Sequence, residues 1–271
     1  MTAASTGRRH VRRTRPALRL NGRAADWGLP VLGLVAVVAL WWLATIVFSI
    51  EKLLVPSPKD VFDSFTAQSG YLLEQTWVTL LETVEGFAVA VVVGIPIAML
   101  IAGSRLLEKM IYPLLLAVNA VPKIAIAPIL VVWMGFGQLP KVVMVFLLCF
   151  FPVVISTAVG LKSTPSELTE LVRSYDAGHM QAFFKVRFPY ALPQVMVGLK
   201  TAISLAVIGA VIAEFVGADS GLGFVIVQSG SSADTPLAFA AMVLLGIISI
   251  VLFYGLVALE KVLLPWAEAN Q

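Results

Sequence analysis

The sequence predicts an all-α membrane protein with about six transmembrane helices. Hydrophobic residues make up 59% of the 271 residues, charged residues make up 13%, and the mean hydropathy is +0.93. An average soluble domain has about 25% charged residues. Several long uncharged runs are separated by short charged segments, and one mostly polar segment, residues 163–193, interrupts them. We expect one membrane domain over residues 27–264 and no large soluble domain.

The N-terminal segment, residues 1–26, carries seven arginines and few apolar residues. We expect a disordered basic cytoplasmic tail. Such a cluster is compatible with nucleic acid, but beside a membrane span it more simply holds the N-terminus inside and touches anionic lipid, so we expect no nucleic-acid partner. The uncharged run 27–50 is longer than a signal-peptide core, and we interpret it as the first span.

The later spans follow from uncharged runs of nearly 20 residues. The run 110–137 contains Pro113, Pro122 and Pro128, so this span is expected to be kinked or discontinuous. Residues 265–271 are expected to form a short cytoplasmic tail. The spans after the first are predicted at 86–104, 110–137, 142–161, 191–215 and 235–259.

Basic residues indicate the orientation of the chain. Six spans with the N-terminus inside place both termini and the polar segment in the cytoplasm, and the excess of Lys and Arg agrees with this. Outside the tail, the residues assigned to the cytoplasmic side are Arg105, Lys109, Lys162, Arg173, Lys185, Arg187 and Lys261. Those assigned to the outer side are Lys52, Lys59 and Lys141.

The polar segment begins with signals for a short amphipathic helix. Thr164 suits the N-cap, Pro165 the first helical position, and Glu167 completes a capping box. Apolar residues then follow at helical spacing. They are Leu168, Leu171, Val172 and Tyr175.

The second half of the polar segment predicts another short helix after a break. Asp176 and Gly178 mark the break, and the apolar spacing then continues until Pro189 forbids a simple continuation. Two short helices meeting at an elbow are therefore expected. One interpretation is a solvated loop whose aromatic residues fold back onto the membrane surface. The other is a docking surface for a second protein, because exposed apolar patches usually mark contacts.

This segment resembles the EAA loop of permease subunits in binding-protein-dependent ABC importers, in the branch of nitrate, sulfonate and taurine permeases. The family's usual glycine position holds Asp176, and Gly178 lies two residues later. Further matches lie at 55–62, 121–137 and 213–226, and the resemblance covers about residues 27–264. The loop residues in register are Glu170, Leu171, Val172, Asp176, Ala177, Val186, Pro189, Leu192 and Pro193.

The resemblance implies a fold like that of a type I ABC importer permease in the bacterial inner membrane. It implies two ATPase subunits docked on the 163–193 loop, an extracellular or periplasmic solute-binding protein, and a second copy of this chain. ATP and Mg²⁺ would bind the ATPase subunits, and the transported solute is expected to be small, polar and anionic. The residues expected to couple to the ATPase are Glu170, Leu171, Val172, Asp176, Ala177, Gly178, Met180, Phe183 and Phe184.

Motifs for chemistry are absent from the sequence. There is no GxxxxGK[ST], HExxH or CxxC motif, and the two histidines, His10 and His179, lie in polar segments. The lone Cys149 lies in an apolar run and is expected to pack there. Gly221 and Gly223 predict a turn in a pore-lining loop. We expect neither an enzyme nor a metal or cofactor site in this chain.

Two charged residues within spans are candidates for function, because an ionisable group there is costly. Lys123 lies in the proline-broken span close to Asn119, and Glu214 lies near the end of the fifth span. We expect Lys123 and Asn119 to line a translocation cavity and Glu214 to shape its outer gate. The alternative is that Lys123 is a structural partner that steadies the broken helix, with Glu214 the nearest candidate for its counter-charge.

Two other classes of protein were weighed. An ion-gradient-driven secondary transporter would favour inverted repeats and a chain of membrane carboxylates, neither of which is visible. A membrane-integral enzyme would need catalytic or metal-binding side chains clustered at one depth, which is also missing.

Overall fold

The structure is a computed structural model that describes residues 23–176 and 178–266. Over these ranges the regular elements are helices, which confirms the all-α prediction. The chain divides into two units, Met1–Ser49 and Ile50–Gln271. The first unit contributes one described helix, α1 (Arg23–Val47), which begins inside the predicted tail. The rest of that tail and most of the C-terminal tail lie outside the described residues.

Four helical segments of the second unit are long and apolar enough to cross a bilayer. They are α3 (Ser69–Gly103), α6 (Gln138–Lys162), the segment Met180–Gly217 and α11 (Thr235–Leu263). A bent pair adds a fifth. The apolar part of α1, Val31–Val47, is shorter than these four. The spans from the second to the sixth therefore have helices of the expected character, and the first span stays a prediction.

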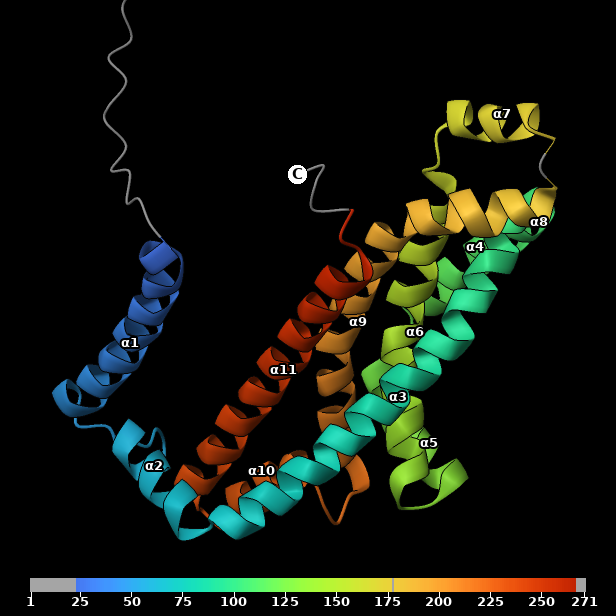
Figure 1. Cartoon of the computed structure of the whole chain (residues 1–271). Coiled ribbons are helices and arrows are strands. Elements are labelled where there is room, and N and C mark those ends of the chain that lie inside the picture. Colours follow the sequence, from blue (N-terminus) through green and yellow to red (C-terminus); the bar gives the residue numbers. More distant parts are fainter. Residues whose placement is uncertain (1–22, 177, 267–271) are drawn as a thin grey trace, which may run out of the picture. The chain divides into compact units, whose positions relative to one another are not determined.

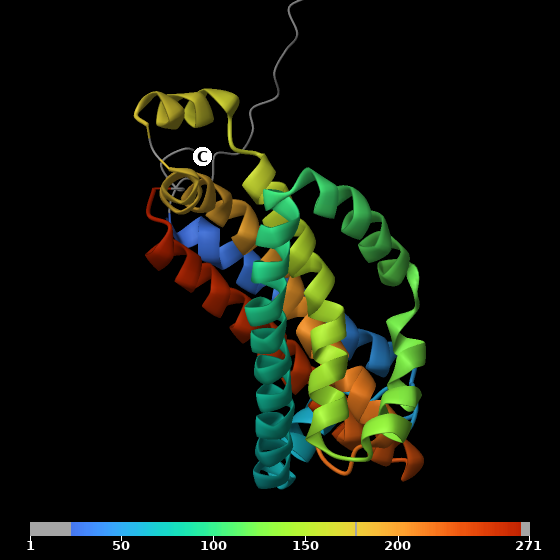
Figure 2. The same cartoon turned by 90° about the vertical axis from the view of Figure 1, so that its right-hand side faces the viewer.

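The predicted third span is discontinuous, as expected. Helix α4 (Arg105–Ala120) and the segment Lys123–Met134 meet at an angle of 78°. That segment consists of a 3₁₀ turn, η1 (Lys123–Ile126), and helix α5 (Ala127–Met134). Pro122 precedes the break and has no N–H to continue the helical ladder. Figure 2 shows α4 and α5, in green, as a bent arm beside the long helices.

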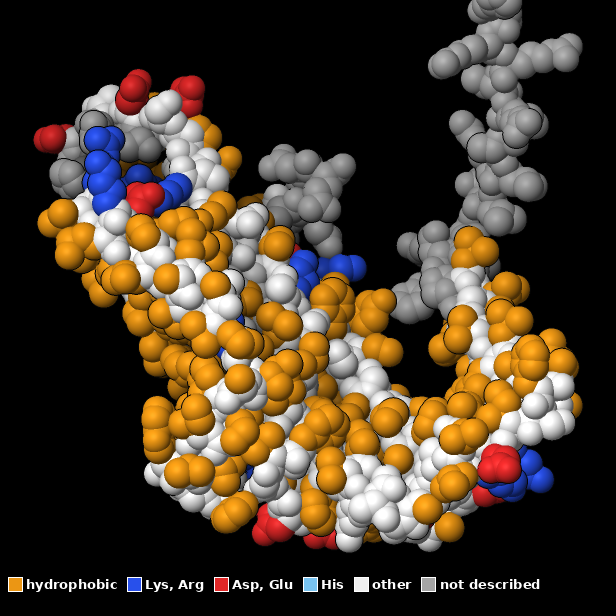
Figure 3. Space-filling view, turned by 180° about the vertical axis from the view of Figure 1, so that it is seen from behind, with side chains coloured by type: hydrophobic (Ala, Val, Ile, Leu, Met, Phe, Trp, Pro, Cys, Tyr) orange, Lys and Arg blue, Asp and Glu red, His pale blue; other side chains and the backbone are white. Residues whose placement is uncertain are grey.

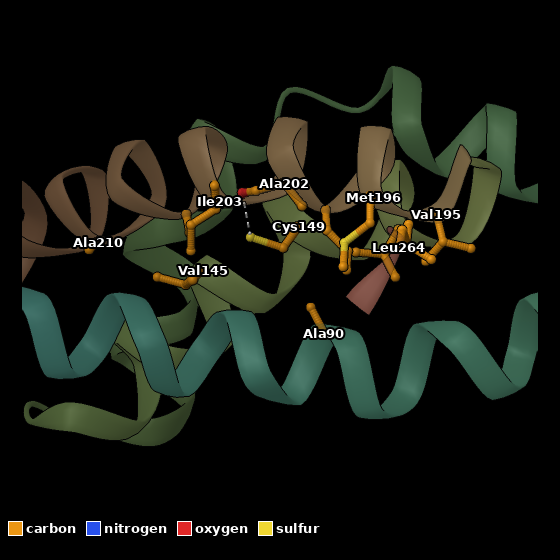
Figure 4. Packing of buried hydrophobic residues seen from close by; sticks show 12 residues of the cluster. Ala90, Val145, Cys149, Val195, Met196, Ala202, Ile203, Ala210 and Leu264 are labelled. Atoms are coloured by element: carbon orange, nitrogen blue, oxygen red, sulfur yellow. Dashed lines mark hydrogen bonds between the residues drawn. The ribbon is translucent and has the colours of Figure 1, made fainter. Parts of the chain in front are cut away.

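The core lies where α3, α6 and α9 (Phe188–Gly217) pack along one another (Figure 1). Small residues allow this close approach. A Cβ on Gly86 would overlap Val145, and one on Gly209 would lie 3.0 Å from the Cα of the same valine. Cys149 is buried there and donates to the Ala202 carbonyl at 3.2 Å (Figure 4), which confirms its packing role.

Two span boundaries differ from the prediction. Helix α3 begins at Ser69, not at residue 86, and so contains Glu82 and Glu85. The fifth span does not begin at residue 191, because the helix runs on from Met180 through Pro189. A π-turn, η2 (Phe183–Arg187), precedes Pro189, and the Phe188 N–H donates to the Phe183 carbonyl five residues back. This wider turn accommodates a residue that lacks an N–H.

Two short helices lie at the end of the second unit opposite α7 (Ser166–Ser174), as Figure 1 shows. Helix α2 (Pro58–Ala67) begins with a full capping box between Ser57 and Asp60. Lys52 donates to Asp60 at 2.5 Å, and this hydrogen bond lowers the pKa of the Asp60 carboxyl to about 2. The carboxylate therefore stays ionised and capped at neutral pH. Helix α10 (Leu222–Ser231) was not predicted.

Candidate functional site

The predicted docking segment forms α7, a break, and a second helix that begins with α8 (His179–Ala182). The expected capping box is absent. Thr164 Oγ1 is buried and has no hydrogen-bond partner among the described residues, and the helix begins one residue later than expected. The two-helix arrangement is otherwise as predicted, except that the second helix continues into α9.

The elbow between the two helices lies at Asp176. Its φ is +55°, in the left-handed region that is costly for most residues with a side chain. Aspartate tolerates this region better than most, because its short carboxylate can bond locally. The departure from the family's glycine is thus compatible with the elbow.

The predicted coupling residues present apolar groups to solvent. Leu171 is 52% exposed, Met180 70% and Phe184 54%. Val172 and Phe183 are partly buried, whereas Glu170 and Asp176 are exposed. Ala177 lies outside the described residues. Figure 3 shows acidic and basic side chains together at the α7 end of the second unit, above a mostly apolar flank.

Lys123 and Asn119 lie together at the bend between α4 and η1. The Lys123 Nζ donates to Asn119 Oδ1 at 2.7 Å and to the Asn119 carbonyl at 3.3 Å. It also lies 4.7 Å from the centre of the Phe151 ring. An amide, a carbonyl and an aromatic face therefore compensate this ammonium.

Glu214 is not the counter-charge of Lys123. Its side chain is 2% exposed and lies in a different cluster. Glu214 Oε1 accepts from the Thr79 hydroxyl at 2.7 Å, and Oε2 accepts from the Gly223 N–H at 2.5 Å. These bonds tie the end of α9 to α3 and to the first turn of α10.

A buried ion pair adjoins Glu214. Lys141 Nζ on α6 lies 2.6 Å from Glu82 Oε1 on α3, and the two side chains are 5% and 3% exposed. Lys141 also donates to the Ser220 carbonyl at 3.3 Å. Lys141 lies in the first turn of α6 and not in a loop before residue 142, and its assignment to the outer side stays a prediction. The ion pair belongs to the helix core, and neither residue was predicted as a functional site.

The α9–α10 turn is held by the same residues. The Gly221 N–H donates to Gln75 Oε1 at 2.6 Å, and the Leu222 N–H donates to Thr79 Oγ1 at 2.8 Å. Gly221 has φ +104°, so the turn expected from the two glycines is confirmed. We call Gln75, Thr79, Glu82, Lys141 and Glu214 the buried polar network.

A sequence signal for this network does exist. Gln75, Thr79, Glu82 and Gly86 are spaced by four, three and four residues, which places them on one face of a helix. The second span was begun at residue 86, so this polar stripe was excluded from the helix. The stripe becomes visible only when residues 75–86 are treated as part of the same helix as the apolar run that follows them.

A polar pocket of about 600 Å³ lies near the same end of the second unit. Its walls include Gln68, Tyr71, Gln228, Ser232 and Asp234. The Tyr71 hydroxyl donates to Gln228 Oε1 at 3.4 Å across it. The second unit thus has a polar pocket near one end and the docking segment, with its exposed apolar side chains, at the other.

A multi-pass helical bundle with an exposed two-helix segment at one end is the arrangement of a membrane transport subunit. Residues 91–268 match the family described as "Binding-protein-dependent transport system inner membrane component". The chain belongs to this family. Its members are transport components and not enzymes.

Relatives with permease names align with most of this chain. The chain is 34% identical to the formylaminopyrimidine transport permease protein ThiX of Halalkalibacterium halodurans, over 88% of this chain and 96% of the relative. It is 27% identical to the taurine transport system permease protein TauC of Escherichia coli, over 92% and 96% respectively.

The fold also matches a solved structure. A chain from the inward-facing MetNI methionine ABC transporter aligns with a TM-score of 0.63 and 21% identity. The alignment covers 72% of this chain and 97% of that chain. The second unit therefore has the fold of a type I ABC importer permease.

Proposed function

We propose that this protein is the subunit of an ATP-driven importer that forms the path for a small polar solute, coupled to separate ATPase subunits through residues 163–193. The observation that carries the proposal is the exposed apolar surface of α7 and α8 in a chain of the importer family. Exposed apolar side chains beside a membrane span need a partner or a lipid surface. Residues 163–193 carry as many acidic as basic side chains, so the segment lacks the net positive charge that attracts a protein surface to anionic lipid.

The assembly would contain two copies of this chain, two ATPase subunits and one solute-binding protein on the outer side. ATP and Mg²⁺ would bind only to the ATPase subunits. Both termini and the docking segment would face the cytoplasm. The basic residues support this orientation, because only Lys52, Lys59 and Lys141 are assigned to the outer side.

The docking surface is tested by reversing one charge on it or by adding one. Glu170→Arg, or Ala177→Asp next to Asp176 in the sequence, should leave the protein in the membrane but reduce co-purification of the ATPase and solute uptake by about tenfold, the effect of losing about 1.4 kcal/mol of association energy. Glu51→Arg is the matched control, because Glu51 is exposed at the opposite end of the second unit. Normal ATPase association in both docking variants would refute the proposal.

The solute pathway is proposed to run past Lys123 and Asn119, with Glu214 shaping its outer gate. Lys123 and Asn119 are supported by their position at the helix break and by their partial exposure. The names of the relatives include a sulfonic acid and a pyrimidine, both small polar organic compounds. Among small polar organic solutes, an anionic one is the kind that the Lys123 ammonium group would bind directly.

Lys123→Met should reduce uptake at least tenfold if the solute is an anion that this ammonium contacts, while basal ATPase activity and melting temperature stay unchanged. Asn119→Leu is the companion variant, because it removes the hydrogen-bond acceptor of Lys123 but keeps the charge. A lower melting temperature in both variants, with normal uptake, would assign the pair a structural role. Full transport by Lys123→Met contradicts the pathway proposal.

An ion-gradient-driven transporter is not favoured, because the chain belongs to a family named for dependence on a binding protein.

A further inference from the structure

The buried polar network holds two carboxyl groups and one ammonium group. Glu82, Lys141 and Glu214 are all buried, and their side chains come from three different helices, α3, α6 and α9. With every group ionised, this cluster would carry one unbalanced negative charge. Burying a lone charge is costly, so such clusters are normally paired or neutralised.

No other cation reaches the cluster among the described residues that pack on it. The nearby titratable groups are Glu85, one turn further along α3, and Asp219 in the α9–α10 turn. Both are acidic and exposed, and Glu85 accepts from the Gln138 amide at 2.6 Å. Neither can balance the second carboxylate.

The hydrogen bonds also lack one donor. Glu82 Oε2 is buried and has no donor among the described residues. The Glu214 carboxyl lies nearby, because its Oε1 accepts from Thr79, which is buried about one turn before Glu82 on the same face of α3. Two ionised carboxylates are acceptors only, so they cannot bond to each other. A single proton between them would satisfy Glu82 Oε2 and cancel the extra charge.

We infer that Glu82 and Glu214 share one proton, so that the cluster of Glu82, Lys141 and Glu214 is electrically neutral. Close carboxyl pairs bind a proton in this way because two like charges at contact distance cannot both persist. Glu214 is then a hydrogen-bond donor to Glu82 and not a free negative charge facing the solute path. Its role is to position the α9–α10 turn. The inference goes beyond the proposed function and does not depend on which solute is carried.

Infrared spectroscopy of the full chain in lipid nanodiscs tests for the proton. A protonated carboxylic acid has its own carbonyl-stretch band, distinct from the bands of a carboxylate. The wild-type protein should show this band at neutral pH. Glu214→Gln and Glu82→Gln should each abolish it, because each leaves one carboxylate to pair with Lys141. Glu85→Gln is the control and should keep it. A band that survives in Glu214→Gln, or that is absent from the wild type, would overturn the inference.

Thermal unfolding gives an independent readout. Each single Gln variant keeps the cluster neutral, so each should shift the melting temperature only slightly. The double variant leaves Lys141 without a carboxylate, and its melting temperature should fall by more than the two single shifts added together. A clear rise in melting temperature for Glu214→Gln alone would show that both carboxylates are ionised in the wild type, because that variant would then remove an unbalanced buried charge.

Discussion

Lys141→Met should lower the free energy of unfolding by about 3–5 kcal/mol, the usual cost of removing one partner of a buried ion pair. The reason is that Glu82 is 2% exposed and would lose the cation that lies 2.6 Å from it. The Ser220 carbonyl would lose a donor as well. The melting temperature of the purified protein in detergent is the measurement. Lys52→Met is the control, because its partner Asp60 lies at the surface end of α2 and the lysine is exposed.

The double variant Glu82→Gln with Lys141→Met separates the charge from the packing. It removes both partners of the ion pair, and Glu214, which is then buried without a cation beside it, is neutral when it keeps its proton. Replacing a buried pair by uncharged residues is often close to neutral. Most of the lost stability should therefore return. If Lys141→Met is as stable as the wild type, the Glu82–Lys141 ion pair does not contribute to stability and the prediction is wrong. Equal losses in the single and double variants would assign the effect to the lysine chain's packing and not to its charge.

Gly221→Ala should be nearly as damaging. The backbone at Gly221 has φ +104° and ψ +163°, a region open almost only to glycine, and another residue held there is strained by about 1–3 kcal/mol. The new Cβ would also overlap the Glu214 carboxyl group, and overpacking of this kind typically adds about 1–3 kcal/mol. We expect a lower melting temperature and reduced transport, because the hydrogen bonds that fix the α9–α10 turn would be weakened.

Gly230→Ala is the matched control. It makes the same change at the other end of α10, where a Cβ would have open space around it. This variant should keep the wild-type melting temperature or exceed it slightly, since alanine favours helix. Equal melting temperatures for Gly221→Ala and Gly230→Ala would contradict this prediction. They would mean that the α9–α10 turn changes its backbone conformation at little cost, despite its hydrogen bonds to α3.

Much of the fold follows from the sequence because long apolar runs have few alternatives in a membrane. Charged residues and prolines that interrupt these apolar runs are harder to interpret from the sequence. Glu82 and Glu85 appeared to end a span, yet α3 contains both, because Lys141 neutralises the first and the second is exposed. Pro189 appeared to end a helix, yet a π-turn carries the helix past it. In both cases a local rule was overridden by a contact or a backbone adjustment that local spacing does not encode.

The candidate site was predictable to different degrees. The docking segment is local, so its apolar spacing and its break at Asp176 could be found from neighbouring residues. The buried polar network could not, because Lys141 is 59 residues from Glu82, and Thr79 is 135 residues from Glu214. A single sequence does not encode which distant polar residues meet. Lys123 was singled out correctly as needing compensation, but its partners are Asn119 and Phe151 instead of Glu214.

The uninterrupted helix from Met180 to Gly217 has a mechanical consequence. At 1.5 Å per residue, its 38 residues follow a path of about 57 Å, and Figure 1 shows that the path bends, with the α8 end running across the direction of the rest of α9. One end carries the exposed Met180, and the other ends three residues after Glu214. The same continuous helix joins the surface that is proposed to bind a partner to the α9–α10 turn, which the Glu214 carboxyl holds. The π-turn beside Pro189 is the point in this helix where the hydrogen bonding departs from the α-helical pattern.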